Sequence, residues 1–259
     1  MTSLGESSGA RSDVVTSKAR LDVELVSRGL AKSREEARRI ILAGEVRIGD
    51  RVARKASEGV TPEARLAVGE KPRFVSRGGD KLSGALDALG LDVAARIAVD
   101  VGASTGGFTD CFLSRGTRRV YAIDVGYGQL DWRLRRDPRV VVIERQNIRE
   151  LPPSAVPETV GLAVVDVSFI SLALVLPTVS RMLAPAADVV ALVKPQFEVG
   201  KGKVGKGGVV RDPALHREAV DAVRAAASRL GFAERGFVES PLRGSRGNRE
   251  FFLHWTASR

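Results

Sequence analysis

The chain has 259 residues, of which 44% are hydrophobic, and a formal net charge of +10 at pH 7. This content can form a buried core, which excludes a wholly disordered chain, and the length allows one large domain or two modest ones. The excess of Lys and Arg favours a polyanionic partner, because these side chains release counterions condensed on phosphates. One cysteine excludes an internal disulfide, and two histidines far apart in the sequence offer no zinc site, so we expect no metal.

Residues 1–17 are rich in Ser and Gly and are expected to form a disordered tail. They contain no apolar segment of the kind that a secretory signal needs. The longest apolar runs elsewhere, such as 172–176 and 189–193, are too short to cross a bilayer. We therefore expect a soluble, cytoplasmic protein without a membrane partner.

Residues 18–67 show the pattern of a small α+β domain. A short amphipathic helix begins near Leu21 and ends at a glycine, and the capping box formed by Ser33 and Glu36 opens a second helix. Two short strands over 46–48 and 51–53 flank a Gly-Asp turn. The second helix carries arginines on its outer side.

The run RLDVELVSRGLAKSREEARRIILAGEVRIGDRVARK resembles the S4-type RNA-binding domain over roughly residues 20–66. Gly-Asp stands at the hairpin where that family often has Asn-Gly, and both pairs suit a tight turn. The alternative is a solvated helix with ordinary surface arginines. The RNA-binding candidates in this domain are Arg20, Arg28, Lys32, Arg34, Arg38 and Arg39.

After a linker expected at 68–75, residues 76–259 alternate apolar strands with helices, which predicts an α/β fold with a mostly parallel sheet. The expected strands are 97–101, 120–124, 140–143, 162–165 and 189–193, and the expected helices are 81–89, 109–114, 172–183 and 213–230. Two successive strands, 233–239 and 250–255, close a seven-stranded sheet. Such an ending, with the last strand antiparallel, is typical of Rossmann-like class I methyltransferases.

Glycines and an acid follow the first of these strands, in the segment DVGASTGGF. Glycine lets the backbone approach a ligand at the carboxyl end of a strand, and an acid ending the next strand is placed to accept hydrogen bonds from ribose hydroxyls. The departure from G-x-G-x-x-G disfavours an NAD(P)-dependent oxidoreductase. S-adenosylmethionine has a ribose and an amino acid but no phosphate, so it suits these acids better. The alternatives are that the acids only cap helices and that Asn147 only makes a turn. The candidate cofactor-binding residues are Asp100, Gly102, Ser104, Thr105, Gly106, Gly107, Asp124 and Asn147.

A second glycine-rich run, GKGKVGKG over 200–207, approaches the phosphate-binding pattern G-x-x-x-x-G-K-[ST]. Gly207 replaces the hydroxyl residue that would hold magnesium, and the run follows a late strand, so we do not predict an ATPase. We interpret it as a basic lid or an RNA contact. Its RNA-binding candidates are Lys201, Lys203 and Lys206.

Four charged residues are expected at one edge of the sheet: Lys81 at the head of a helix, Asp166 and Lys194 at the ends of strands, and Glu250 at the start of the last strand. The carboxyl ends of parallel strands share one edge with the start of an antiparallel strand. We therefore expect Asp166, Lys194 and Glu250 to converge near the cofactor. The alternative is a set of ordinary surface salt bridges.

The order of these four residues, with the segments FVSRGGDKL, DVGASTGGFTD, DVGYGQL, VDVSFISL, LVKPQFEVGKG, GGVVRDP and GNREFFL, resembles the TlyA family from about residue 20 onward. That family joins an S4-type domain to an FtsJ-like methyltransferase domain. The resemblance implies a Lys-Asp-Lys-Glu catalytic tetrad and S-adenosylmethionine-dependent methylation of a cytidine ribose 2′-hydroxyl in ribosomal RNA. Large-subunit RNA is favoured and small-subunit RNA remains open.

Within the tetrad we assign Lys194 to the ribose hydroxyl, as its general base or as the stabiliser of the developing oxyanion. Lys81 supplies an opposing positive charge, and Asp166 and Glu250 orient the two ammonium groups. The rival interpretation is a non-catalytic RNA-binding or ribosome-assembly protein on a methyltransferase fold. Many family members carry a haemolysin label, which we interpret as an indirect effect. The partners expected are ribosomal RNA or ribosomal subunits, and the chain is expected to be a monomer.

Overall fold

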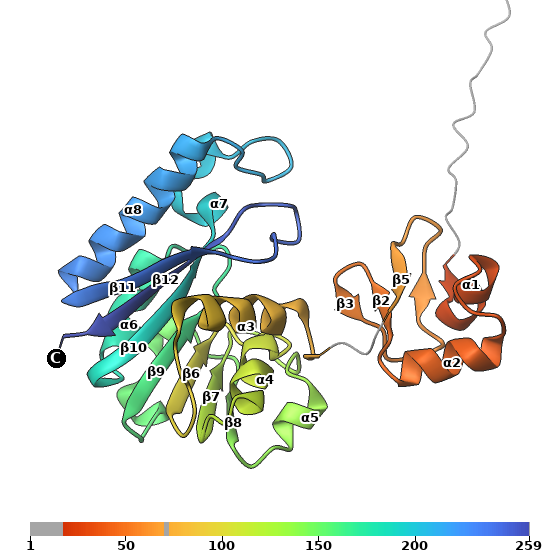
Figure 1. Ribbon diagram of the computed structural model, residues 1–259, viewed down its shortest axis with the longest axis horizontal. Helices are drawn as coiled ribbons and strands as arrows, with labels where there is room; N and C mark the ends of the chain where they lie inside the picture. The colour runs from red at the N-terminus through yellow and green to blue at the C-terminus, as the bar shows by residue number, and fades with distance from the viewer. Residues whose placement is uncertain (1–17, 70–72, 259) are drawn as a thin grey trace, which may run out of the picture. The chain divides into compact units, whose positions relative to one another are not determined.

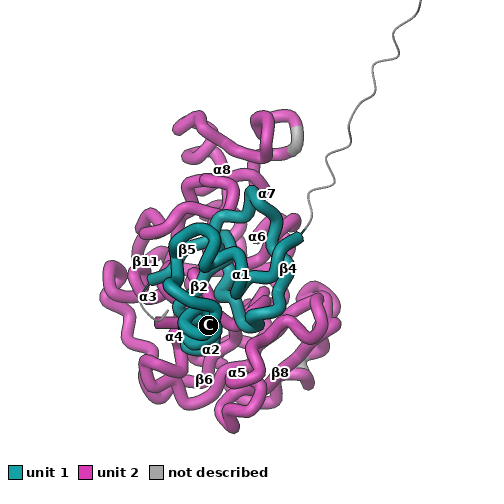
Figure 2. The backbone as a smooth tube through the Cα atoms, turned by 90° about the vertical axis from the view of Figure 1, so that its right-hand side faces the viewer, with its two compact units in different colours: residues 1–72 teal, residues 73–259 magenta. Residues whose placement is uncertain are grey.

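A computed structural model describes residues 18–69 and 73–258, which divide into two compact units, residues 1–72 and 73–259 (Figure 2). The expected disordered tail, residues 1–17, lies outside the described residues. So do residues 70–72, in the middle of the expected linker, and residue 259. Within the described ranges, none of the helices combines the length and the apolar character that crossing a membrane requires.

The described residues of the first unit, 18–69, form two helices and five very short strands. The elements are β1 (Ala19–Arg20), α1 (Leu21–Ser27), α2 (Arg34–Leu42), β2 (Val46–Ile48), β3 (Arg51–Val52), β4 (Gly59–Val60) and β5 (Leu66–Val68). Strand β2 lies between β3 and β5, and β1 pairs with β4. The Ser33 side chain accepts a hydrogen bond from the Glu36 backbone N–H, as the capping box predicts, whereas the Glu36 carboxylate reaches the N–H of Lys32.

The second unit is built on one seven-stranded sheet in the order β11-β12-β10-β9-β6-β7-β8 (Figure 1). Its strands are β6 (Ile97–Val101), β7 (Arg119–Ile123), β8 (Val140–Ile143), β9 (Val160–Val165), β10 (Leu183–Val193), β11 (Phe232–Glu239) and β12 (Phe251–Ala257). Strand β12 pairs antiparallel with both of its neighbours, and the other pairs are parallel. The predicted sheet, with its last strand antiparallel, is confirmed.

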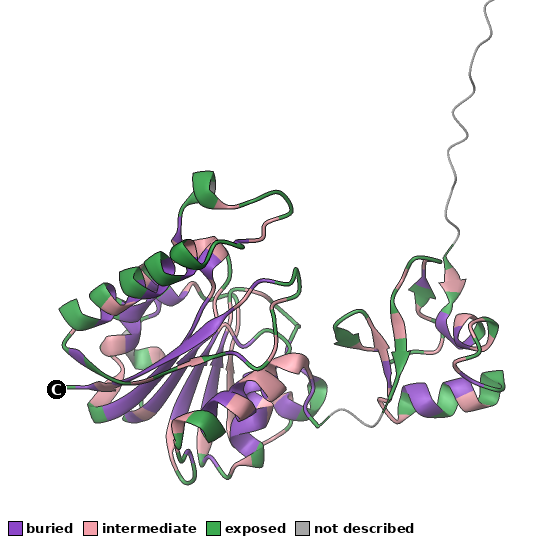
Figure 3. Cartoon of the chain, turned by 45° about the horizontal axis from the view of Figure 1, so that its top comes forward, coloured by how far each residue is buried: buried purple, intermediate pink, exposed green. Residues whose placement is uncertain are grey.

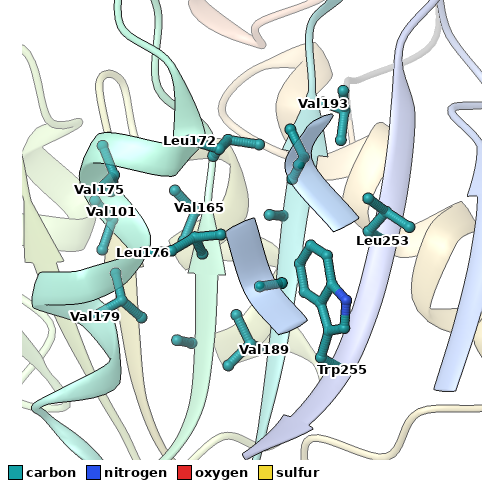
Figure 4. Packing of buried hydrophobic residues seen from close by; sticks show 14 of the residues in the cluster. Val101, Val165, Leu172, Val175, Leu176, Val179, Val189, Val193, Leu253 and Trp255 are labelled. Atoms are coloured by element: carbon teal, nitrogen blue, oxygen red, sulfur yellow. The ribbon is translucent and has the colours of Figure 1, made fainter. Parts of the chain in front are cut away.

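Helices cover both faces of this sheet (Figures 1 and 3). They are α3 (Arg77–Leu89), α4 (Gly107–Ser114), α5 (Trp132–Arg135), α6 (Leu172–Ser180), α7 (Pro195–Glu198) and α8 (Pro213–Arg229), with 3-10 turns η1 (Ile148–Glu150), η2 (Pro153–Ala155) and η3 (Lys201–Lys203). Side chains of α3 and α4 share one apolar cluster with the sheet, and those of α6 and α8 share the other. In Figure 4 residues of α6 lie over β9, and Trp255 of β12 lies beside its registered partner Val189 of β10. Burial on both faces explains the apolar strand sequences.

Most element boundaries lie within two residues of the sequence prediction, and the larger differences are at the end of α6, the start of β10 and the start of α3. The helix expected over 172–183 ends at Ser180, and Leu183 already begins β10, whose pairing with β9 shifts register between Leu183 and Asp188. The apolar run offered no signal for this change, because buried helices and buried strands have similar compositions. Helix α3 begins at Arg77 instead of residue 81. The glycine at position 79 lets the first turn pack against Phe74, whose Cδ2 would lie 2.6 Å from an added Cβ.

Candidate functional site

The candidate site lies at the edge where the parallel strands end. Gly102 follows β6, Asp124 follows β7, Asp166 follows β9 and Lys194 follows β10. A cavity of about 1240 Å³ opens there. It is lined by residues at the ends of β6, β7 and β9 and by residues of α7, the short helix that follows β10. The lining residues used below are Gly102, Ser104, Asp124, Gln129, Gln146, Asn147, Asp166, Ser168, Phe169, Gln196 and Phe197.

The loop after β6 is held to the loop after β7 by Asp124. Its Oδ2 accepts a hydrogen bond from the Ser104 N–H at 2.9 Å, and its Oδ1 accepts one from the Gly126 N–H at 2.6 Å. Gly102 adopts a φ of +87°, and an added Cβ would overlap the carbonyl group of Asp166, lying 2.9 Å from its carbon. A side chain at this position would therefore fill the space between the two strand ends.

The remaining loop residues have mainly structural surroundings. Gly106 and Gly107 are buried where α4 begins: an added Cβ at Gly106 would lie 2.8 Å from a Leu130 methyl group, and one at Gly107 would lie 2.8 Å from the Gly79 nitrogen. Thr105 is exposed, and its carbonyl accepts a hydrogen bond from the Asp131 N–H. None of these three is among the residues that line the cavity.

Asp100 differs from Asp124 because it is fully buried behind the loop. Thr109 donates a hydrogen bond to its Oδ2 at 2.7 Å, while Oδ1 has no hydrogen-bond partner among the described residues. Burial raises the pKa of Asp100 to about 7, and the nearby carboxylates of Asp166 and Asp124 add to this effect. The side chain of Asp100 is not part of the cavity wall.

Asn147 lines the cavity and also makes a turn, so both sequence interpretations apply to it. Its Oδ1 accepts a hydrogen bond from the Arg149 N–H at 3.2 Å, which caps η1. This cap fixes the side chain at the wall.

The four charged residues form two ion pairs. Lys194 Nζ lies 2.6 Å from Asp166 Oδ1 and donates a hydrogen bond to Ser168 Oγ at 2.9 Å. Lys81 Nζ donates to Glu250 Oε2 at 2.6 Å, and the side chains of this pair are only 12% and 3% exposed. An ion pair buried to this extent is not an ordinary surface salt bridge.

The two ion pairs are neighbours through strand pairing. Val193 of β10 pairs with Phe251 of β12, so Lys194 and Glu250 flank one registered pair of residues. Only Asp166 of the four lines the cavity, joined there by Ser168. The Lys194–Asp166 pair therefore faces the cavity through Asp166, whereas neither Lys81 nor Glu250 is among the lining residues.

Sequence reasoning missed two aromatic residues at the cavity. Phe169 is 88% exposed and has a φ of +66°, and its ring centroid lies 5.1 Å from that of Phe197. Each stands three positions after a tetrad residue, Asp166 or Lys194. That spacing, with a strand end before each aromatic, was a usable signal.

In the first unit three of the RNA-binding candidates converge. Arg20, Arg34 and Arg38 all donate hydrogen bonds to the carboxylate of Asp22. Arg39 is separate from them, with its side chain 76% exposed and 3.6 Å from Glu36.

Arg28 and Lys32 have other surroundings. The Arg28 guanidinium donates to the carbonyls of Thr61, Pro62 and Ala64 and to Glu24, so it holds a loop of its own unit. Lys32 is exposed just before α2, where its backbone N–H donates to Glu36.

The glycine-rich loop after β10 is tied down at its far end. Asn248 is 2% exposed; its Nδ2 donates to the Gly208 carbonyl, and its Oδ1 accepts from the Val210 N–H. Lys201 and Lys203 belong to η3, and Lys203 pairs with Glu218 at 2.5 Å. Lys206 is exposed in the loop.

The described residues contain no group of three or more His, Cys, Asp or Glu side chains that could hold a metal ion.

Comparison with known proteins agrees with this architecture. The model of the FtsJ-like methyltransferase family matches residues 74–257, and that of the S4 domain matches residues 19–66. The 16S/23S rRNA (cytidine-2′-O)-methyltransferase TlyA of Mycobacterium tuberculosis is 53% identical over 91% of this chain and 89% of its own length. Hemolysin A of Brachyspira hyodysenteriae is 39% identical over 91% of this chain and 99% of its own length.

A solved structure of a provisionally named hemolysin from Streptococcus thermophilus superposes with a TM-score of 0.74 and 42% identity. It covers 94% of this chain and 90% of its own. The chain thus belongs to the FtsJ-like methyltransferases, within the TlyA family that carries an S4 domain before the methyltransferase unit.

Proposed function

We propose that this chain transfers a methyl group from S-adenosylmethionine to a cytidine ribose 2′-hydroxyl in ribosomal RNA. The observation that carries the proposal is the Lys194–Asp166 ion pair, which faces a cavity bounded by the Gly102 loop and Asp124. The relative at 53% identity is named for this reaction on 16S and 23S RNA. The Gly102 loop, which we assign to the methyl donor, and the four charged residues of the tetrad lie at the same edge of the sheet.

The cavity suits the methyl donor by its lining. A Cβ at Gly102 would fill the space where the loop meets β9, and Asp124 with Gln129, Gln146 and Asn147 supplies polar groups for a ribose and an adenine. Its volume of about 1240 Å³ exceeds the ~300–1000 Å³ usual for one small ligand, so a target nucleotide fits beside the donor. When bound, S-adenosylmethionine supplies an electrophilic methyl group on a sulfonium.

The contacts of Lys194 favour one of its two assigned roles. An ammonium group has three N–H donors. One is donated to Ser168 Oγ, and Asp166 Oδ1 lies 2.6 Å from Nζ as an ion-pair partner that receives no aligned hydrogen bond. A donor is therefore left for the ribose oxygen, where the positive charge stabilises the negative charge that develops during transfer. Asp166 fixes the direction of this ammonium group. Glu250 does the same for Lys81, which adds positive charge from the neighbouring strand end.

Phe169 and Phe197 provide a place for the target base. Exposed aromatic rings stack nucleobases, with a contribution of ~1–3 kcal/mol per base. Phe169 is 88% exposed at the cavity that contains Asp166 and Ser168. A base stacked on this ring would bring its ribose towards Lys194.

The proposed substrate also determines the partners and the cellular location that we expect for this protein. Ribosomal RNA and ribosomal subunits are the expected partners, contacted by the basic first unit, and the reaction then belongs in the cytoplasm. Both ion pairs of the tetrad form within one chain, as a monomeric enzyme requires.

The test is to incubate the full chain with S-adenosylmethionine and ribosomal subunits, or the RNA extracted from them, from a strain that lacks the modification. Nuclease digestion followed by mass spectrometry should detect 2′-O-methylcytidine, and primer extension should locate it in one or both subunits. Binding of the donor without methylation of any of these substrates would support the rival function, a non-catalytic ribosome-assembly protein.

A further inference from the structure

The first unit contains a buried carboxylate shared by three arginines. Asp22 is fully buried, and its Oδ1 accepts a hydrogen bond from Arg20 Nε at 2.9 Å. Its Oδ2 accepts from Arg20 Nη2 at 3.2 Å, from Arg34 Nη2 at 3.1 Å and from Arg38 Nε at 3.3 Å. Arg20 directly precedes α1, and Arg34 and Arg38 lie one turn apart on α2, so the carboxylate joins the two helices.

The charges of this cluster do not balance. Three guanidinium groups face one carboxylate, which leaves two positive charges in excess, while the three arginine side chains stay 48%, 54% and 54% exposed. One arginine would neutralise the charge of the carboxylate, and each further one adds repulsion between like charges. The hydrogen bond from Arg20 is the main reason that the pKa of Asp22 is well below its ordinary value, so this carboxylate stays ionised. The excess charge calls for an anion from outside the unit.

We propose that Asp22 is a positioning residue, which holds Arg20, Arg34 and Arg38 in a preformed array that receives the phosphates of an RNA backbone. This inference rests on the proposed RNA-modifying function. Arg34 and Arg38 each give one nitrogen to Asp22, and a guanidinium has five N–H donors, so donors remain for phosphate oxygens. Arginines that are ordered before binding lose less conformational freedom when RNA arrives.

The surrounding arginines show that this arrangement is specific. Arg28 donates to three backbone carbonyls and stabilises a loop, so it is not available in the same way. Arg39 lies on α2 next to Arg38 in sequence but does not contact Asp22, and its side chain is 76% exposed. Arg39, whose ion-pair partner is Glu36 at 3.6 Å, therefore serves as an internal reference for an arginine that is not held by Asp22.

Asp22→Asn separates positioning from simple charge because the two predict opposite changes. The substitution removes a negative charge, so an affinity governed by net charge would rise and would depend more steeply on salt. Under the positioning role the three guanidinium groups disperse, and RNA affinity falls about tenfold, equal to about 1.4 kcal/mol. The salt dependence also becomes shallower, because fewer arginines meet phosphates at once.

The experiment measures the affinity of the full chain for purified ribosomal RNA over a series of KCl concentrations. The matched control is Glu35→Gln, which makes the same charge change at an exposed position of α2. We expect weaker binding and a shallower salt slope for Asp22→Asn, and unchanged or slightly tighter binding for Glu35→Gln. In methyl transfer, KM for RNA should rise in Asp22→Asn while kcat at saturating RNA stays the same.

Two results would overturn different parts of this inference. If Asp22→Asn binds as tightly as the wild type or more tightly, while Arg34→Ala and Arg38→Ala bind weakly, the positioning role is wrong and the RNA contact stands. If both alanine variants bind RNA like the wild type, this surface is not the RNA contact and that part of the proposed function fails.

A measurement on the wild-type chain covers the case in which Asp22→Asn does not fold. Heteronuclear relaxation of the arginine Nε–H groups should show Arg20 and Arg38 as ordered before RNA is added and little changed afterwards. Arg39 should be mobile in the free protein. If Arg20, Arg38 and Arg39 are equally mobile in the free protein, the array is not preformed.

Discussion

Gly102 lies against the backbone of Asp166, so that the loop after β6 and the end of β9 touch with no room for a side chain at position 102. A Cβ at position 102 would lie 2.9 Å from the Asp166 carbonyl carbon, and the backbone there has a φ of +87°. A side chain at position 102 would therefore disturb both the loop that we propose binds the donor and the backbone of Asp166.

Gly102→Ala should impair both the binding of S-adenosylmethionine and methyl transfer. The methyl group has to push the Asp166 backbone away and also strains a left-handed conformation. We expect affinity for S-adenosylmethionine to fall at least about tenfold, or ~1.4 kcal/mol, and methyl transfer to fall further. Calorimetry and single-turnover assays measure the two effects. Full activity in the alanine variant would show that β9 moves freely and that the contact has no role.

Lys194→Ala should lower methyl transfer by roughly 100- to 10,000-fold, the usual range for a group acting on the transferred proton or its oxygen. The affinity for S-adenosylmethionine should change little, because Lys194 is assigned to the ribose of the target, whereas the donor is assigned to the Gly102 loop and Asp124. Lys194→Arg distinguishes the two roles of this lysine, since guanidinium remains protonated. As an oxyanion stabiliser, position 194 should retain activity with Arg well above that with Ala. Equal loss in both variants would indicate a general base.

Asp124→Ala should weaken binding of S-adenosylmethionine without unfolding the sheet. A charged acceptor contributes ~1.5–3 kcal/mol per hydrogen bond, and this carboxylate also holds the Ser104 and Gly126 N–H groups in place. Isothermal titration calorimetry gives the affinity, and Asp137→Ala, at a carboxylate that pairs with Arg139 outside the cavity, is the control. An unchanged affinity in a folded Asp124→Ala protein would remove this residue from the donor site.

Most strands of the second unit's sheet could be predicted to within one or two residues, whereas β10 begins at Leu183, well before the expected start at residue 189. Strands 97–101 and 140–143 match β6 and β8, because strands covered on both faces have continuous apolar sequences. The strands β1, β4 and β5 of the first unit could not be predicted. They have two or three residues each and depend on distant partners, as in the pairing of Ala19 with Val60.

The site was predictable to the level of strand ends. Acids and lysines that directly follow apolar strands must meet at one edge, so the grouping of Asp166 with Lys194 followed from the pattern. The burial of Asp100 and the convergence of arginines on Asp22 did not. Both depend on which neighbouring helix covers a side chain, and helical spacing alone does not determine that.

Asp100 should make the stability of the fold depend on pH. Its pKa rises from 3.8 in an unfolded chain to about 7 in the folded protein, so folded Asp100 keeps a proton that the unfolded chain releases. The contribution is fully present below pH ~4 and is lost as the pH rises through ~7. Its upper limit is a few kcal/mol, at about 1.4 kcal/mol per pKa unit. Asp100→Asn should lack this dependence. Its stability relative to the wild type should therefore increase as the pH rises from 5 to 8.

Thermal unfolding of both proteins across that range gives the comparison. Other buried carboxylates with raised pKa values, such as Glu198, are present in both and cancel in the difference. A difference in Tm that stays constant from pH 5 to 8 would contradict the assignment of this titration to Asp100.

Phe169 should show opposite effects on stability and on activity. Its φ of +66° places a bulky residue in the left-handed region, which costs ~1–3 kcal/mol when the residue is not glycine. Its ring is 88% exposed, so little burial is lost when it is removed. Phe169→Gly should therefore leave Tm unchanged or raise it. Methyl transfer to RNA should nevertheless fall about tenfold or more, because stacking of a base contributes ~1–3 kcal/mol.

Phe169→Tyr is the matched variant, since it keeps both the ring and the backbone strain. It should retain activity at the wild-type Tm. Because Phe169 contacts Phe197, the Phe169→Gly, Phe197→Ala double variant tests whether the two rings act together. A double loss well below the product of the single losses would indicate one shared stacking surface. If Phe169→Gly methylates RNA at the wild-type rate, the exposed ring does not contact the target base, and the strain at position 169 requires another explanation.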